Sequence, residues 1–219
     1  MLETAQGGGN YLTIISDGKL HQVVPEGTEG AVLREGTLKD ETTYSKWERV
    51  YNAVTGIITN ASIVAGKFGK SFVLVLNDGS HPTATLSLSV DSSFGEDMLK
   101  KFLSIDLSKP VRIVPYALPE ANGKKGKKGI TIYQDEKKIQ SYFHSYDTES
   151  KISTPLHGYP EVPVAKKGKT ISPDEWKMHF MSAKLFMVEY IDEHPQFGGQ
   201  APANTAEVAS EVLADGDDF

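Results

Sequence analysis

The sequence predicts a mainly β protein with one helix inserted among its strands and a second helix near its C-terminal end. Short segments rich in Val, Ile and Thr recur between turn signals such as Asp-Gly, which is typical of β-strands. Only two segments carry apolar residues at helical spacing. Beyond the second of them, residues 196–219 contain five acidic residues and no Lys or Arg, which indicates an acidic tail.

Composition narrows the class of protein. The chain has 219 residues, 39% of them apolar, enough for one domain with appendages. Cysteine is absent, which removes disulfides, cysteine zinc sites and thiol nucleophiles. No apolar run approaches the ~18–20 residues of a membrane helix, and the polar, Gly-rich start lacks the features of a secretory signal. We therefore expect a cytoplasmic protein with no membrane partner.

The N-terminal half predicts a disordered start followed by successive strands. Residues 1–10 are polar and Gly-rich. Tyr11–Ser16 and Lys19–Val24 flank an Asp-Gly pair and predict a β-hairpin. Residues 33–49 look polar and irregular. Three strands are then predicted, at 49–64, 71–77 and 83–90, and Gly56 inside the first predicts a bulge or sharp bend.

The C-terminal half supplies both helices. Asp91–Leu103 is the first, with Asp91 or Ser92 as its cap. A strand at 109–118, a loop at 119–129, a hairpin of 130–133 with 139–144 and a loop at 147–171 follow. Ser172–Glu193 is the second helix and begins with a capping box. Its apolar stripe is expected to dock on the strands, and a helix that faces a partner or DNA is the alternative; the stripe consists of Trp176, Phe180, Ala183, Met187, Tyr190 and Ile191.

Three meandering strands, a helix and further strands follow the order of an OB-fold barrel, which residues 50–145 fit in length. Other all-β barrels give a similar order and remain alternatives. The predicted organisation is a disordered N-terminus at 1–10, an OB-fold-like domain with a C-terminal amphipathic helix at 11–195, and a disordered acidic tail at 196–219.

Signatures of catalysis are scarce. The six histidines are scattered without the spacing of a metal site, and no phosphate-binding loop or nucleophile elbow is present. We therefore expect no enzyme activity, no metal and no cofactor, although an enzyme with a scattered active site stays a remote alternative.

A lysine cluster is the main pointer to nucleic acid. Four lysines on glycine backbone occupy Gly123–Gly129, where they can follow a phosphate chain, with aromatic residues nearby on which unpaired bases can stack. The alternatives are a solvated hairpin tip and aromatics buried in the core. The candidate nucleic-acid-binding residues are Lys67, Phe68, Lys70, Arg112, Tyr116, Lys124, Lys125, Lys127, Lys128, Tyr133 and Tyr142.

The acidic tail is the second feature that indicates a function. It ends on Asp215, Asp217, Asp218 and the aromatic Phe219, which form a candidate partner-binding motif. A flexible anion can also occupy a basic groove in place of nucleic acid. The remaining alternative is an ordinary solubilising tail.

These features together resemble the single-stranded DNA-binding proteins of bacteria and, more closely, of tailed bacteriophages. The resemblance covers residues 50–145, the segment GKKGITIYQDEKKIQSYF at 126–143, and the tail, where Asp218 stands in place of the proline usual in the bacterial proteins. It implies a replication and recombination factor of the host cytoplasm that coats single strands and recruits replication proteins through its tail. The alternatives are a β-barrel virion or assembly protein and an RNA- or oligosaccharide-binding OB domain.

Overall fold

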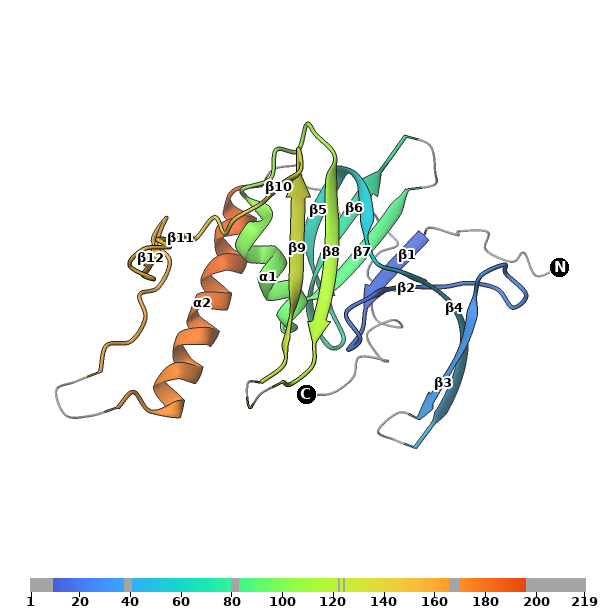
Figure 1. Ribbon diagram of the computed structural model, residues 1–219, viewed down its shortest axis with the longest axis horizontal. Coiled ribbons are helices and arrows are strands. Elements are labelled where there is room, and N and C mark those ends of the chain that lie inside the picture. The colour runs from blue at the N-terminus through green and yellow to red at the C-terminus, as the bar shows by residue number, and fades with distance from the viewer. Residues whose placement is uncertain are drawn as a thin grey trace.

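A computed structural model describes residues 10–37, 41–79, 83–121, 123, 125–165 and 170–195. Ten strands form one mixed sheet in the order β10-β9-β8-β5-β6-β7-β1-β2-β4-β3, and β11 pairs with β12 separately (Figure 1). The strands are β1 (Asn10–Ile14), β2 (Leu20–Val23), β3 (Val32–Thr37), β4 (Thr43–Tyr51), β5 (Val54–Gly66), β6 (Gly69–Asn77), β7 (Ala84–Ser89), β8 (Val111–Leu118), β9 (Lys127–Gln134), β10 (Lys137–Lys138), β11 (His144–Tyr146) and β12 (Ser153–Pro155), with helices α1 (Ser93–Phe102) and α2 (Pro173–Glu193).

The predicted N-terminal hairpin is confirmed, with Thr13 of β1 opposite His21 of β2. Its turn requires glycine for two reasons. Gly18 has φ +71°, and a Cβ at this position would lie 2.2 Å from the backbone nitrogen of Ala117 in β8. The turn between β1 and β2 therefore packs directly against β8, a strand that is not its neighbour in the sheet.

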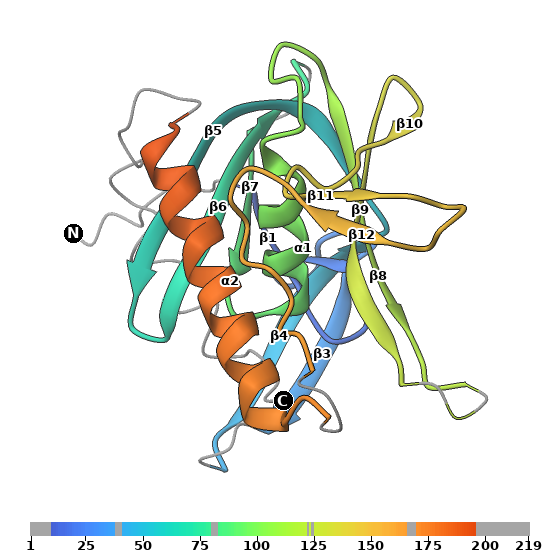
Figure 2. The same cartoon turned by 90° about the vertical axis from the view of Figure 1, so that its left-hand side faces the viewer.

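The predicted meander is also confirmed as β5, β6 and β7. Figure 2 shows β5 arching strongly over the top of the sheet. The register shift lies between Ile58 and Asn60 and not at Gly56, which instead lies close to the backbone of Asn77. Alternate side chains of β6 and β7 point into the core and are fully buried: Phe72, Leu74, Leu76, Leu86 and Leu88.

Both helices start at the predicted caps. The Ser92 hydroxyl accepts the Gly95 N–H at 3.0 Å, and Ser172 forms the capping box with Glu175. The apolar residues of α1 are buried on one stripe: Phe94, Met98, Leu99 and Phe102. The stripe of α2 is buried only from Ala183 onward, and the expectation is wrong for Phe180, which is 55% exposed. Figure 1 shows the first turns of α2 reaching past the lower end of α1.

The prediction of a closed barrel is wrong, because the described sheet stays open. Closure of an OB-type barrel needs the strand before α1 to pair with the last strand, here β7 with β9. The edge of β7 instead pairs in parallel with β1. On the edge of β9, the Ile130 N–H donates to Asp97 of α1 at 2.8 Å, and the Lys101 ammonium donates to the Ile130 carbonyl. Both edges are thus already hydrogen-bonded.

Three element predictions also need correction. Residues 33–49, expected to be irregular, form most of the β3–β4 hairpin. Strand β9 begins at Lys127 instead of Ile130, so two of the clustered lysines belong to the sheet. The predicted pairing of 130–133 with 139–144 is replaced by the short strand β10, in which Lys137 lies opposite Gln134 and Lys138 opposite Tyr133. Strand β11 pairs with β12 instead. The predicted disorder of residues 1–10 and 196–219 lies outside the described residues, except that Asn10 belongs to β1.

Candidate nucleic-acid interface

The antiparallel pair β8–β9 forms a ribbon with one buried and one outward face. Ile113 and Ile132 lie opposite each other on the inward face, and both are completely buried. Residues directly opposite each other share a face of the sheet. The outward face of the ribbon therefore carries Arg112 opposite Tyr133, Val114 opposite Thr131, Tyr116 opposite Gly129 and Leu118 opposite Lys127.

Two predicted aromatic residues lie on this outward face of the ribbon. Tyr133 is half-buried beside the exposed Arg112. Tyr116 lies across Gly129, since a Cβ on that glycine would come within 2.7 Å of the tyrosine hydroxyl. Burial, and then the negative charge of Asp97, raise the pKa of Tyr116 above its usual value. Both tyrosines thus lie on strands of the sheet, each with part of its surface accessible.

The lysines lie at one end of the same ribbon. Lys125, Lys127 and Lys128 are exposed, whereas Lys124 lies outside the described residues. Lys127 pairs with Leu118 and Lys128 with Ala117, so these two lysines project to opposite sides of the sheet. They hold fixed positions on a strand, in contrast to the flexible loop that the glycines suggest.

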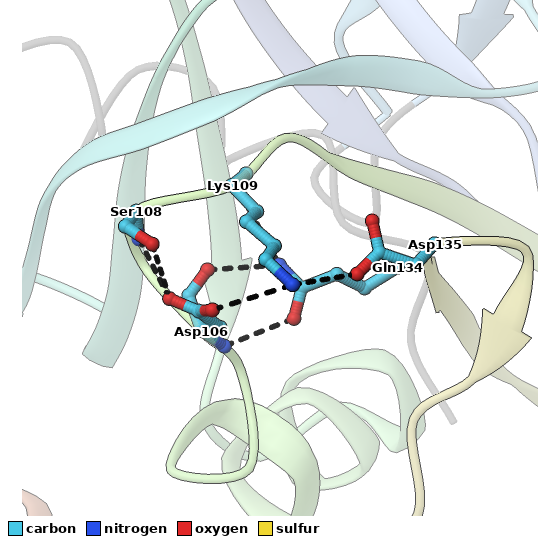
Figure 3. Close-up of polar contacts among 5 residues, drawn as sticks. All are labelled: Asp106, Ser108, Lys109, Gln134 and Asp135. Carbon is cyan, nitrogen blue, oxygen red and sulfur yellow. Dashed lines mark hydrogen bonds and ion pairs between the residues drawn. The ribbon is translucent and has the colours of Figure 1, made fainter.

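The opposite end of the ribbon is fixed by a polar network (Figure 3). The buried Gln134 amide accepts the Asp106 N–H at 3.0 Å and donates to the Asp106 carbonyl at 2.8 Å. Lys109 contacts Asp135 at 2.7 Å, and this carboxylate raises the pKa of Lys109. Hydrogen bonds from Ser108 lower the pKa of Asp106. These groups satisfy one another and hold the α1–β8 loop against the end of β9.

The remaining predicted residues lie elsewhere. Lys67, Phe68 and Lys70 occupy the β5–β6 hairpin, where Phe68 is 52% exposed and the Lys67 ammonium lies 5.3 Å from its ring centroid. Figure 2 shows this hairpin and the loop end of β8–β9 on opposite sides of α1 and α2. Tyr142 packs with α2, stacked at 4.0 Å on His157 and with its hydroxyl 3.4 Å from that of Tyr190. The predicted residues therefore form no single cluster.

Residues missed by the sequence analysis include those of the β3–β4 hairpin. There the ring of Tyr44 lies within 5.6 Å of both the Arg34 guanidinium and the Lys46 ammonium. A signal existed, because Tyr44 and Lys46 are two residues apart and would therefore lie on the same face of a strand. The segment lacks the run of apolar residues by which the other strands were recognised.

Comparison of the chain with protein-family models, with curated proteins and with solved structures found no match. Within the described ranges, no group of three or more His, Asp or Glu side chains is arranged to hold a metal ion. In that same part of the chain, neither helix combines the length and apolar character needed to cross a bilayer. The geometry of the ribbon and of the β3–β4 hairpin is therefore the basis for proposing a function.

Proposed function

We propose that this protein binds single-stranded DNA without sequence specificity, coating it during replication or recombination, and that the outward face of the β8–β9 ribbon is its main contact surface. The observation that carries the proposal is the arrangement of this face. Tyr133 lies beside Arg112, Tyr116 lies across Gly129, and Lys127 follows at the end of the same ribbon. This face thus combines two rings with one cation beside the first ring and another at the end of the ribbon.

This arrangement suits an unpaired strand better than a duplex. Each base that stacks on an aromatic side chain contributes ~1–3 kcal/mol, whatever its identity, because every base has a π-face. In a duplex the bases are already stacked on one another, so the rings gain little. The cations contact phosphates and release counterions, which makes binding depend on salt.

Two further features support the same proposal. The order β5, β6, β7, α1, β8, β9, with β5 paired to both β6 and β8, follows the OB layout up to the point of closure. The acidic residues Asp215, Asp217 and Asp218 and the ring of Phe219 lie outside the described residues. We propose that they recruit replication proteins or compete with DNA, as their composition suggests.

Fluorescence titration with oligo-dT, with duplex DNA of equal length and with oligo-U tests the proposal. We expect oligo-dT to bind more tightly than duplex, and Tyr133→Ala to weaken binding about 5- to 140-fold, the effect of losing one stacked base. Tyr146→Ala is the matched control, because Tyr146 is 62% exposed but lies on β11, outside the ribbon. An affinity for duplex DNA equal to or higher than that for oligo-dT would contradict the proposal. A higher affinity for oligo-U than for oligo-dT would favour an RNA-binding function.

A further inference from the structure

The β3–β4 hairpin is a two-stranded arm at the end of the sheet. Strand β2 pairs with β4 only from Glu48 to Tyr51, whereas β3 pairs with the preceding residues, from Thr43 to Glu48. Figure 1 shows the arm extending away from the body, on the side opposite α2. A hairpin with no core of its own is marginally stable in water. Most of its side chains are at least partly exposed.

One face of the arm repeats the arrangement on the β8–β9 ribbon. Tyr44 lies opposite Gly36, and a Cβ on this glycine would lie 2.5 Å from the tyrosine hydroxyl. Arg34 and Lys46 form the next pair on the same face, two positions along the strands, with their charges 5.5 and 5.6 Å from the centroid of the Tyr44 ring. Each of the two hairpins thus holds a tyrosine flat across a glycine, on a face that also carries basic side chains.

A chain of polar side-chain contacts links the arm to the rest of the sheet. The Arg34 guanidinium lies 3.6 Å from the Glu48 carboxylate, which contacts His21 Nδ1 at 2.8 Å. His21 Nε2 in turn contacts Asp17 at 3.0 Å. Asp17 precedes Gly18, whose backbone packs on Tyr116 and Ala117 of the ribbon. Contacts therefore run from the ring of Tyr44 to the ribbon, and they fix one hairpin relative to the other.

We infer that the arm is a second platform for single-stranded nucleic acid, in which Tyr44 stacks on a base and Arg34 and Lys46 attract the flanking phosphates. Guanidinium and ammonium groups beside an aromatic ring provide both interactions that an unpaired strand offers. This inference rests on the proposed function and extends it, because a strand long enough to leave the ribbon would gain a second contact on the same molecule. Linked contacts of this kind raise affinity without any change at the first site.

The test compares two lengths of oligo-dT on the intact protein. A short strand of ~8 nucleotides, within the roughly 4–16 nucleotides that one OB-type site covers, occupies the ribbon alone. A strand several times longer reaches both platforms. We expect Tyr44→Leu to weaken binding of the long strand about 5- to 140-fold and to leave the short strand unaffected. Tyr44→Phe, which keeps the ring, retains both affinities.

Three comparisons make the result decisive. Ser45→Ala, on the other face of the same strand, is the control for disturbing the arm. Unchanged short-strand affinity shows that Tyr44→Leu is folded. If the long strand binds Tyr44→Leu as tightly as wild type while Tyr133→Ala binds it weakly, the second platform is wrong and the proposed function stands. If wild-type protein binds neither strand, the proposed function itself fails.

Discussion

His21 shows how a single buried residue can hold two parts of this fold together. Its ring is only 6% exposed and lies between the carboxylates of Asp17 and Glu48, so both ring nitrogens face oxygen atoms. Carboxylates only accept hydrogen bonds, so a ring nitrogen that carries a proton can donate to the carboxylate beside it. Glu48 is itself 4% exposed, which makes its charge costly to bury without a partner.

We expect His21→Ala to lower the free energy of unfolding by about 1–3 kcal/mol, because the buried Glu48 carboxylate loses its closest partner and keeps only the Arg34 guanidinium at 3.6 Å. Chemical denaturation measures this change. The double variant His21→Leu/Glu48→Leu is the control, since replacing both members of a buried pair by apolar groups is often nearly neutral. A loss below ~1 kcal/mol in the single variant, the range of an exposed pair, would contradict this role.

His144 makes stability depend on pH. Burial, and then the positive charge of Lys100 and of His179, lower the pKa of His144 in the folded protein. The unfolded chain has an ordinary histidine pKa near ~6.5, so between the folded-state pKa and this value it binds more protons than the folded protein. Stability from this residue is complete above about pH 6.5 and declines as the pH falls toward the lower, folded-state pKa.

Thermal unfolding measured at a series of pH values tests this prediction. We expect His144→Gln to flatten the fall in stability just below about pH 6.5. His157→Gln serves as the comparison, because His157 is another ring of the same aromatic cluster, stacked on Tyr142. An unchanged slope in the His144 variant would show that another group dominates the acid response.

At the level of elements, the sequence predicted correctly the strands and helices that have an apolar face, a clear turn or a capping residue. The Asp17-Gly18 turn, the meander β5–β7 and both helix starts were predicted correctly for this reason. Strands β3 and β4 were missed because most of their side chains remain at least partly exposed, so burial imposes no clear alternation. The open sheet was missed because closure depends on which edges find partners. Asp97 and Lys101 satisfy the β9 edge from a helix 29 to 33 residues away in sequence.

Sequence patterns identified some residues of the candidate site but not how they are arranged. Lysines and tyrosines near residues 112–133 were recognisable by type, but their common face follows from the register of β8 with β9. No sequence pattern identifies Gly129 as the partner of Tyr116 or Gly36 as that of Tyr44, because those pairs form between strands. The distance between the β5–β6 hairpin and the ribbon end likewise depends on how β5 bends.

The start of β9 provides a direct test of the lysine cluster. Lys127 and Lys128 begin this strand, whereas Lys151 and Lys177 are exposed lysines outside the ribbon. We expect Lys127→Gln/Lys128→Gln to weaken oligo-dT binding and to reduce the slope of log affinity against log salt by up to ~0.7 per lost phosphate contact. Lys151→Gln/Lys177→Gln, which removes two exposed lysines outside the ribbon, should leave the slope close to that of wild type. Equal effects of both pairs would mean that general charge, and not the ribbon end, drives binding.

At the scale of the whole molecule, charge is divided between body and tail. Residues 196–219 contain five acidic residues and no basic residue, whereas residues 1–195 contain all 23 basic residues and the other 24 of the 29 acidic ones. The body is thus nearly neutral and carries local basic surfaces at its hairpins, including Lys125, Lys127 and Lys128. A tethered anion can compete for such surfaces with a nucleic acid.

Deleting residues 199–219 should therefore raise the affinity for oligo-dT. A flexible linker of ~10–15 residues keeps a tethered segment at roughly millimolar effective concentration, so even weak contacts with the lysines would be populated. The gain should be largest at low salt, where the Debye length reaches about 30 Å at 0.01 M instead of about 8 Å at 0.15 M. Titration of both proteins at matched ionic strength measures it. Equal affinities at low salt would rule out the competition.

Removing only Phe219 separates the two proposed roles of the tail. The deletion leaves all five side-chain carboxylates in place, so affinity for oligo-dT should change little at any salt concentration. Binding to replication proteins that depends on the tail should be lost, because an aromatic ring fills an apolar pocket while the aspartates contact basic residues at its rim. Pull-down of purified polymerase or helicase with each protein measures this. Partner binding that survives loss of Phe219 would leave the tail with an electrostatic role alone.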